Sequence, residues 1–108
     1  MNIGETLLVL SGKWKLSLLY ELGGQTLRFN DLQRALPGIS KKMLTKQLRD
    51  LEEEGLVVRN VIPDNPPKVE YSLSSYGETL GPLFDVMFDW GANHRKRKSE
   101  RLFKKLSE

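Results

Sequence analysis

A predicted helix over residues 41–54 carries side chains whose types and spacing could bind an anion. Helical periodicity places three leucines on one side, where they can pack on a core: Leu44, Leu48 and Leu51. The opposite side carries hydroxyl and cationic groups: Lys42, Thr45, Lys46 and Arg49. Ser40 and Lys41 add a hydroxyl and a cation at the N-terminal end, where the helix dipole favours phosphate. Acidic residues are confined to the last part of the segment, so we expect them to lie away from a bound anion.

The elements that must position these groups follow from periodicity and turn residues. We predict helices over 3–10, 13–22, 31–36 and 41–54, the last two with Asn30 and Ser40 as N-caps. Residues 27–29 are long enough for a single-bridge strand, and 56–62 and 68–73 are predicted to form a hairpin with its tip at 63–67. Ser74 is predicted to cap a last long helix, in which Pro82 requires a late start or a kink.

This order of elements predicts a mainly α (α+β) fold, a winged helix-turn-helix with a two-stranded wing and C-terminal dimerisation helices. We expect a single domain over 1–108, with the helix-turn-helix at about 30–54 and the wing at about 56–73. The dimerisation helices are expected at about 2–10 and 75–106. The candidate dimer contacts are apolar: Leu7, Leu83, Phe84, Met87, Phe88 and Trp90.

In such a fold the helix over 41–54 is placed to enter the major groove of double-stranded DNA, beside a wing whose tip is flanked by Arg59 and Lys68. The candidate DNA-binding residues are Ser40, Lys41, Lys42, Thr45, Lys46, Arg49, Arg28 and Lys68. A solvated amphipathic helix would carry similar surface lysines. A winged-helix module that binds only proteins is the alternative function.

Other classes of function lack the residues they require. The 108 residues include no cysteine and only one histidine, His94, so we expect no disulfide, no metal centre and no cofactor. The sequence shows no arrangement of a nucleophile with a neighbouring acid or base that would indicate an enzyme. The N-terminal residues lack the features of a secretory signal and no apolar run approaches a membrane span, so a cytoplasmic protein without a membrane partner is expected.

The charge is unevenly distributed, although the net value is only +3. Residues 91–108 hold seven Lys or Arg and two Glu, so a basic tail follows a mildly acidic body. This tail could contact phosphates or could be a solvated helix end, and the sequence leaves both open.

Three runs of the sequence resemble HxlR-type bacterial transcriptional regulators: residues 12–22, 27–59 and 66–91. They carry the motifs G-K-W, R-F-x-x-L, G-I-S-x-K-M-L-T-x-x-L-x-x-L, P-x-V-E-Y-x-L and D-W-G. The resemblance implies a dimeric winged-helix protein that binds operator DNA, with its recognition helix on Ser40 to Arg49 and its wing on Asn60 to Glu70. Many members carry a cysteine shortly before G-K-W, and some use it to sense oxidants or aldehydes. This chain has none, so any effector is expected to be an unidentified small molecule and not a thiol reagent.

Overall fold

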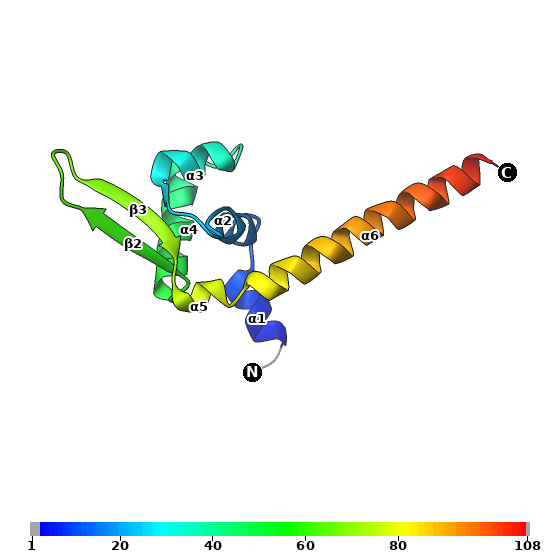
Figure 1. Cartoon of the computed structure of the whole chain (residues 1–108), viewed down its shortest axis with the longest axis horizontal. Coiled ribbons are helices and arrows are strands. Elements are labelled where there is room, and N and C mark those ends of the chain that lie inside the picture. Colours follow the sequence, from blue (N-terminus) through cyan, green and yellow to red (C-terminus); the bar gives the residue numbers. More distant parts are fainter. Residues whose placement is uncertain (1–2, 108) are drawn as a thin grey trace.

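A computed structural model describes residues 3–107, apart from the side chains of Thr6, Leu7 and Val9. The elements in chain order are α1 (Ile3–Leu10), α2 (Lys15–Glu21), β1 (Leu27–Arg28), α3 (Phe29–Ala35), α4 (Lys41–Glu53), β2 (Val57–Ile62), β3 (Lys68–Leu73), α5 (Ser75–Glu78) and α6 (Gly81–Leu106). Figure 1 shows α2, α3 and α4 gathered beside the β2–β3 hairpin, while α6 projects from the opposite side of the molecule. The fold is the predicted winged helix-turn-helix.

The core lies where α2, α3 and α4 meet the base of the sheet. Its largest fully buried side chains are all leucines: Leu18, Leu19, Leu22, Leu32, Leu44, Leu48 and Leu51. Leu56, Val57 and Tyr71 extend this core to the sheet. The stripe of leucines predicted on α4 is therefore confirmed as its core-facing side.

The three strands form one antiparallel sheet in the order β1-β3-β2. The β2–β3 hairpin runs in continuous register from Val57 opposite Leu73 to Ile62 opposite Lys68, and β1 adds Leu27 opposite Tyr71 and Arg28 opposite Glu70. Because β1 leads directly into α3, the sheet joins the wing to the start of the helix-turn-helix.

One predicted N-cap is wrong. Asn30 lies inside α3, which begins one residue earlier, and the backbone N–H of Arg28 donates to the Asp31 carboxylate at 3.1 Å. The Asp31 carboxylate, in the first turn of α3, accepts from the backbone N–H of Arg28, which no helical carbonyl could satisfy. The start of α3 therefore needs no cap at Asn30.

Ser74 does cap a helix, but the helix is the single turn α5 and not the long α6. The Ser74 hydroxyl accepts a hydrogen bond from the backbone N–H of Gly77 at 2.9 Å. The long helix begins at Gly81 with Pro82 in its first turn, where the missing N–H of proline leaves no helical bond unmade. The late start predicted from Pro82 is confirmed.

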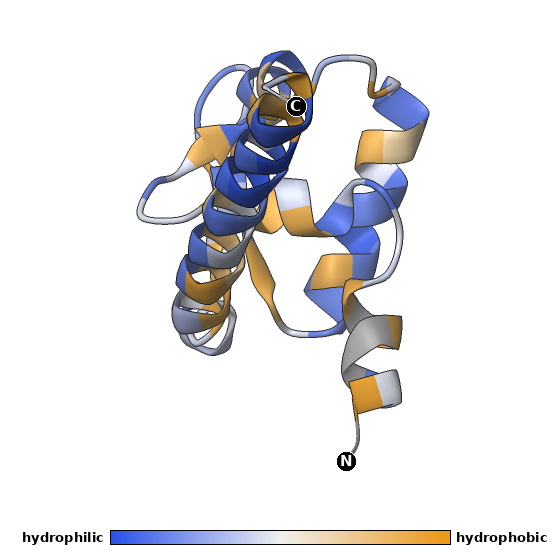
Figure 2. Ribbon diagram, turned by 90° about the vertical axis from the view of Figure 1, so that its right-hand side faces the viewer, coloured by the Kyte–Doolittle hydropathy of each residue, from blue (hydrophilic) through white to orange (hydrophobic). Residues whose placement is uncertain are grey.

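α6 is the longest element and makes the molecule elongated, with extents of 66 × 34 × 23 Å. Figure 2 shows pale and orange bands in the half of α6 near the domain and mainly hydrophilic residues toward its C-terminal end. Within residues 3–107, no helix combines the length and apolar character needed to span a membrane.

Candidate nucleic-acid interface

The two ends of α4 are set by residues that the sequence marks for those positions. The Ser40 hydroxyl accepts a hydrogen bond from the backbone N–H of Met43 at 3.0 Å, which confirms it as the N-cap. Gly38 and Gly55 stand on either side of the helix with positive φ values of 91° and 76°, a conformation that other residues rarely adopt. α4 therefore has a defined start and end, and its outer side faces solvent along its whole length.

The outer side of α4 carries the predicted cations. Lys41, Lys42, Lys46 and Arg49 are exposed. Thr45 is half-buried, and its hydroxyl donates to the carbonyl oxygen of Lys41 at 2.8 Å. The threonine hydroxyl hydrogen is thus used within the helix, which leaves the hydroxyl oxygen as an acceptor only.

Asp50 reduces the positive charge on part of this side. Its Oδ2 lies 3.1 Å from Lys46 Nζ and 3.8 Å from Lys15 Nζ. Arg49 takes part in none of the ion pairs found among the described residues. Lys41 and Lys42 are likewise absent from these ion pairs, but of the three cations Arg49 alone lines the groove described next.

A groove of about 390 Å³ separates α4 from the sheet. Its lining residues are Phe29, Thr45, Leu48, Arg49, Glu52, Arg59 and Tyr71. Arg59 reaches the groove from β2, where it lies opposite Tyr71 in the register. Our candidate list omitted Arg59, although its place next to the wing tip was the available signal.

Glu52 is an acidic residue of this segment that borders the basic side. Its side chain lines the same groove as two arginines and a threonine. Helical spacing explains the position, because Glu52 follows Arg49 by three residues and so lies on the same side of α4. The expectation that the acids lie away from a bound anion stays a prediction.

Arg28 and Lys68 are brought together at a second groove, between the start of α3 and the wing tip. This groove has a volume of about 630 Å³ and is lined by Arg28, Phe29, Asn30, Asp64, Asn65, Pro66, Pro67, Lys68 and Val69. Lys68 Nζ lies 3.3 Å from Asp64 Oδ2. Phe29 lines both grooves, so the groove that holds Arg49 and Arg59 adjoins the one that holds Arg28 and Lys68.

Asp31 holds the backbone next to Arg28 in place. The hydrogen bond from the Arg28 backbone N–H, followed by the hydrogen bond from the Arg34 side chain, lowers the pKa of Asp31 below its ordinary value. Asp31 is therefore ionised at neutral pH and anchors the β1–α3 junction that carries Arg28.

The predicted dimer contacts on α6 lie far from this surface and include an exposed apolar face. Phe84, Met87 and Phe88 line a groove of about 260 Å³ together with Leu16, Ser17 and Tyr20 of α2. The ring centroids of Tyr20 and Phe88 are 4.8 Å apart. Leu83 and Trp90 are exposed nearby on the same helix, and the Trp90 ring stacks on His94. The candidate contact Leu7 lies outside the described side chains.

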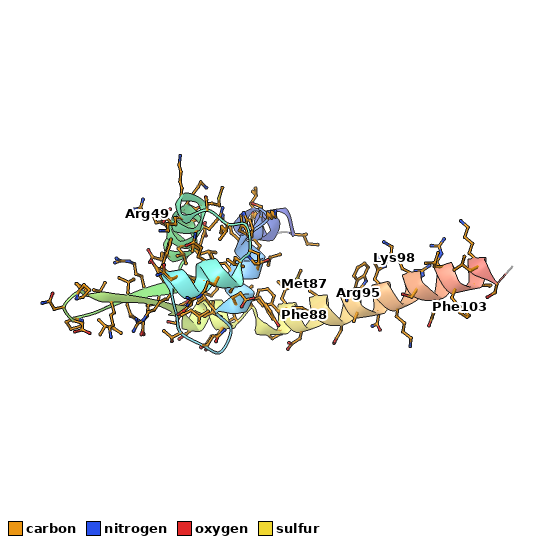
Figure 3. The ribbon with its side chains drawn as sticks, turned by 90° about the horizontal axis from the view of Figure 1, so that it is seen from above. Arg49, Met87, Phe88, Arg95, Lys98 and Phe103 are labelled. Carbon is orange, nitrogen blue, oxygen red and sulfur yellow. The ribbon has the colours of Figure 1, made fainter. Side chains whose placement is uncertain are left out.

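Figure 3 shows Arg49 on α4, Met87 and Phe88 near the start of α6, and Arg95, Lys98 and Phe103 farther out along the projecting helix. The basic tail is therefore well separated from α4 within one subunit. In the part of the chain that the structure describes, no three His, Cys, Asp or Glu side chains are grouped so that they could hold a metal ion.

Comparison with known proteins assigns the chain to a family. Residues 9–99 match the sequence model of the HxlR-like helix-turn-helix family. The chain belongs to this family. The HTH-type transcriptional regulator YtcD of Bacillus subtilis (strain 168), an uncharacterised HxlR relative, is 44% identical over 108 residues, which cover 100% of this chain and 86% of YtcD.

A second relative and a solved structure agree with this assignment. The uncharacterised HTH-type transcriptional regulator YdzF of the same Bacillus strain is 49% identical over 87 residues, which cover 80% of each protein. The redox regulator HypR in its reduced form has a TM-score of 0.82 at 46% identity, over 86% of this chain and 92% of HypR. YtcD and YdzF are named as regulators of transcription, and HypR is named as a redox regulator.

Proposed function

We propose that this chain is a homodimeric transcriptional regulator that binds an inverted-repeat operator in double-stranded DNA. The observation that carries the proposal is the outer side of α4, which is exposed, basic and capped at Ser40, and which continues through two grooves to Arg59, Arg28 and Lys68. An α-helix of this kind fits the major groove, and a flanking hairpin reaches the neighbouring backbone.

The chemistry of each side chain on α4 indicates whether it would contact a phosphate or a base of the DNA. Lys42, and Lys46 next to Asp50, act as point charges suited to phosphate. Arg49 has a planar fork of donors that matches the acceptor pair of guanine, and the Thr45 methyl group suits a thymine methyl. We therefore assign Lys42 and Lys46 to phosphates and Thr45 and Arg49 to base edges.

The homodimer is proposed from the apolar face of α6. Three large apolar side chains that lie close together on this helix are left uncovered: Met87 is 45% exposed, Phe88 53% and Trp90 67%. A matching face from a second copy would bury this area at about 25 cal/mol per Å². Two-fold symmetry then presents two copies of α4 to two half-sites, so the operator is an inverted repeat. The protein would act in the cytoplasm, where bacterial DNA lies.

The test is selection of bound sequences from a random pool of duplexes, followed by a salt titration on the best sequence. We expect an inverted repeat with half-site centres about 34 Å apart or a multiple of this distance. Affinity should fall steeply with salt, because bound phosphates release counterions. If no sequence is enriched over the starting pool, the chain is not a sequence-specific regulator, and the protein-interaction module becomes the better assignment.

A further inference from the structure

Glu52 has a buried oxygen that no described residue satisfies. Its Oε1 is shielded from solvent and accepts no hydrogen bond from residues 3–107. A buried carboxylate oxygen without a partner is costly, so native proteins normally pair such an oxygen with a protein donor or an ordered water molecule. The position is also unexpected, because the carboxylate lines a groove on the side of α4 that carries the cations.

The groove supplies two partners that could satisfy this oxygen. Arg49 lies on the same helix, three residues before Glu52, and Arg59 enters from the opposite wall on β2. Both arginines are exposed, and neither takes part in an ion pair among the described residues. The structure therefore places two unpaired guanidinium groups and one unsatisfied carboxylate around the same space.

We propose that Glu52 is a positioning residue for Arg59, an inference that rests on the proposed function. When a duplex lies against α4 and the wing, exclusion of water strengthens the attraction between the carboxylate and the guanidinium. Two N–H groups of Arg59 then bind Glu52, and its remaining donors are held in a defined plane toward a base edge in the groove beside the wing, and not toward a phosphate. Arg49 borders the same groove from the helix that carries Glu52, and in this proposal it keeps its own assignment to a base edge.

A positioning role for Glu52 predicts an effect on DNA affinity opposite to the one expected from its charge alone. A negative charge near DNA repels phosphates, so its removal normally raises the affinity for every sequence. If Glu52 positions Arg59, its removal must instead lower the affinity for the selected duplex while the affinity for an unrelated duplex is unchanged or rises. The next residue, Glu53, is exposed and lines neither groove, so it provides a matched control for the charge.

The experiment measures the Kd of the full chain for the selected duplex and for a scrambled duplex, in the wild type and in Glu52→Gln, Glu52→Asp and Glu53→Gln. We expect Glu52→Gln to reduce the ratio of the two affinities by about fivefold or more, the lower range of one lost base-specifying contact. Glu52→Asp keeps the charge but withdraws the carboxylate, so it should reduce the ratio as well. Glu53→Gln should leave the ratio unchanged. A thermal melt of each variant confirms that it is folded.

A double-variant cycle with Arg59→Gln identifies the partner. If Glu52 acts through Arg59, then Glu52→Gln changes the ratio little further once Arg59 has been replaced. Equal ratios in Glu52→Gln, Glu53→Gln and the wild type would overturn the inference and leave the proposed function standing. A wild-type chain that does not distinguish the two duplexes would instead overturn the proposed function, and the positioning role with it.

Discussion

Lys46 Nζ lies 3.1 Å from Asp50 Oδ2, one turn farther along the exposed side of α4. The side chains are 65% and 33% exposed, and ion pairs in such positions contribute little to stability. The pair does have a consequence for binding, because Asp50 offsets part of the charge that Lys46 presents. Two neighbouring cations of one helix, Lys46 and Arg49, are thus unequal in what they can offer DNA.

We predict that Lys46→Ala weakens DNA binding evenly across sequences. A lysine that contacts only phosphate carries no sequence information, so the salt slope should fall by about one while selectivity is kept. The free energy of unfolding should change by no more than about 0.5 kcal/mol, since the side chain is on the surface. Titrations of the selected and scrambled duplexes at several salt concentrations measure this. A loss confined to the selected duplex would show that Lys46 reads a base instead.

Leu48→Ala should lower the stability of the protein, in contrast to Lys46→Ala, which should lower only its affinity for DNA. Leu48 is 2% exposed and packs in the core beneath the basic side of α4, so the truncation should lower the free energy of unfolding by about 2–5 kcal/mol. Chemical denaturation of the free protein measures this effect. A change under about 1 kcal/mol would mean that α4 does not dock on the domain through this stripe.

The helices and the wing could be predicted because their signals are local. The Ser40 hydroxyl and the leucine stripe of α4 each act within a few residues, and each is found where it was predicted. The error at Asn30 arises because a residue of the right type for an N-cap is not always used as one: the first turn of α3 is closed by the Asp31 carboxylate instead. Ser74 is an N-cap as predicted, but the helix that it caps is one turn long, and the long helix begins separately at Gly81 with Pro82 in its first turn.

The groove between α4 and the sheet could not be predicted in the same way. Arg59 and Glu52 lie in different elements, and only the register of β2 against β3 brings Arg59 to the wall opposite α4. Charge counting along the sequence grouped Glu52 with its acidic neighbours, whereas its position on the helix groups it with Arg49. The sequence alone does not show which segments that are distant along the chain lie side by side, and that information is needed to predict the groove.

We predict that Gly77→Ala destabilises the junction between the wing and α6. A Cβ at this position would lie 2.2 Å from the carbonyl oxygen of Leu56, and that oxygen already accepts a hydrogen bond from the Ser74 backbone. Because the clash is with backbone, relief requires a backbone shift that should cost about 1–3 kcal/mol. Thermal melts of Gly77→Ala and of Gly81→Ala, whose Cβ would meet open space, give the comparison. Equal stability of the two variants would contradict the close approach.

A charged residue in the apolar face of α6 should separate the proposed dimer. Phe88→Glu places a carboxylate beside Met87, where a second copy would have to desolvate it, so sedimentation at micromolar concentration should shift from dimer to monomer. Lys96→Glu is the control, because Lys96 is exposed, does not line that groove and lies two and a half helical turns after Met87, on the opposite side of α6. A wild-type chain that sediments only as a monomer would rule out the homodimer.

The most direct test of α4 as the recognition helix is the affinity of Arg49→Ala for the selected duplex at physiological salt. Arg49 is exposed, has no ion pair among the described residues and borders the groove shared with Arg59, so its loss should weaken binding to the selected duplex by about 1–3 kcal/mol. The scrambled duplex should lose much less. If Arg49→Ala and Lys46→Ala both bind the selected duplex as tightly as the wild type, α4 is not the helix that reads DNA.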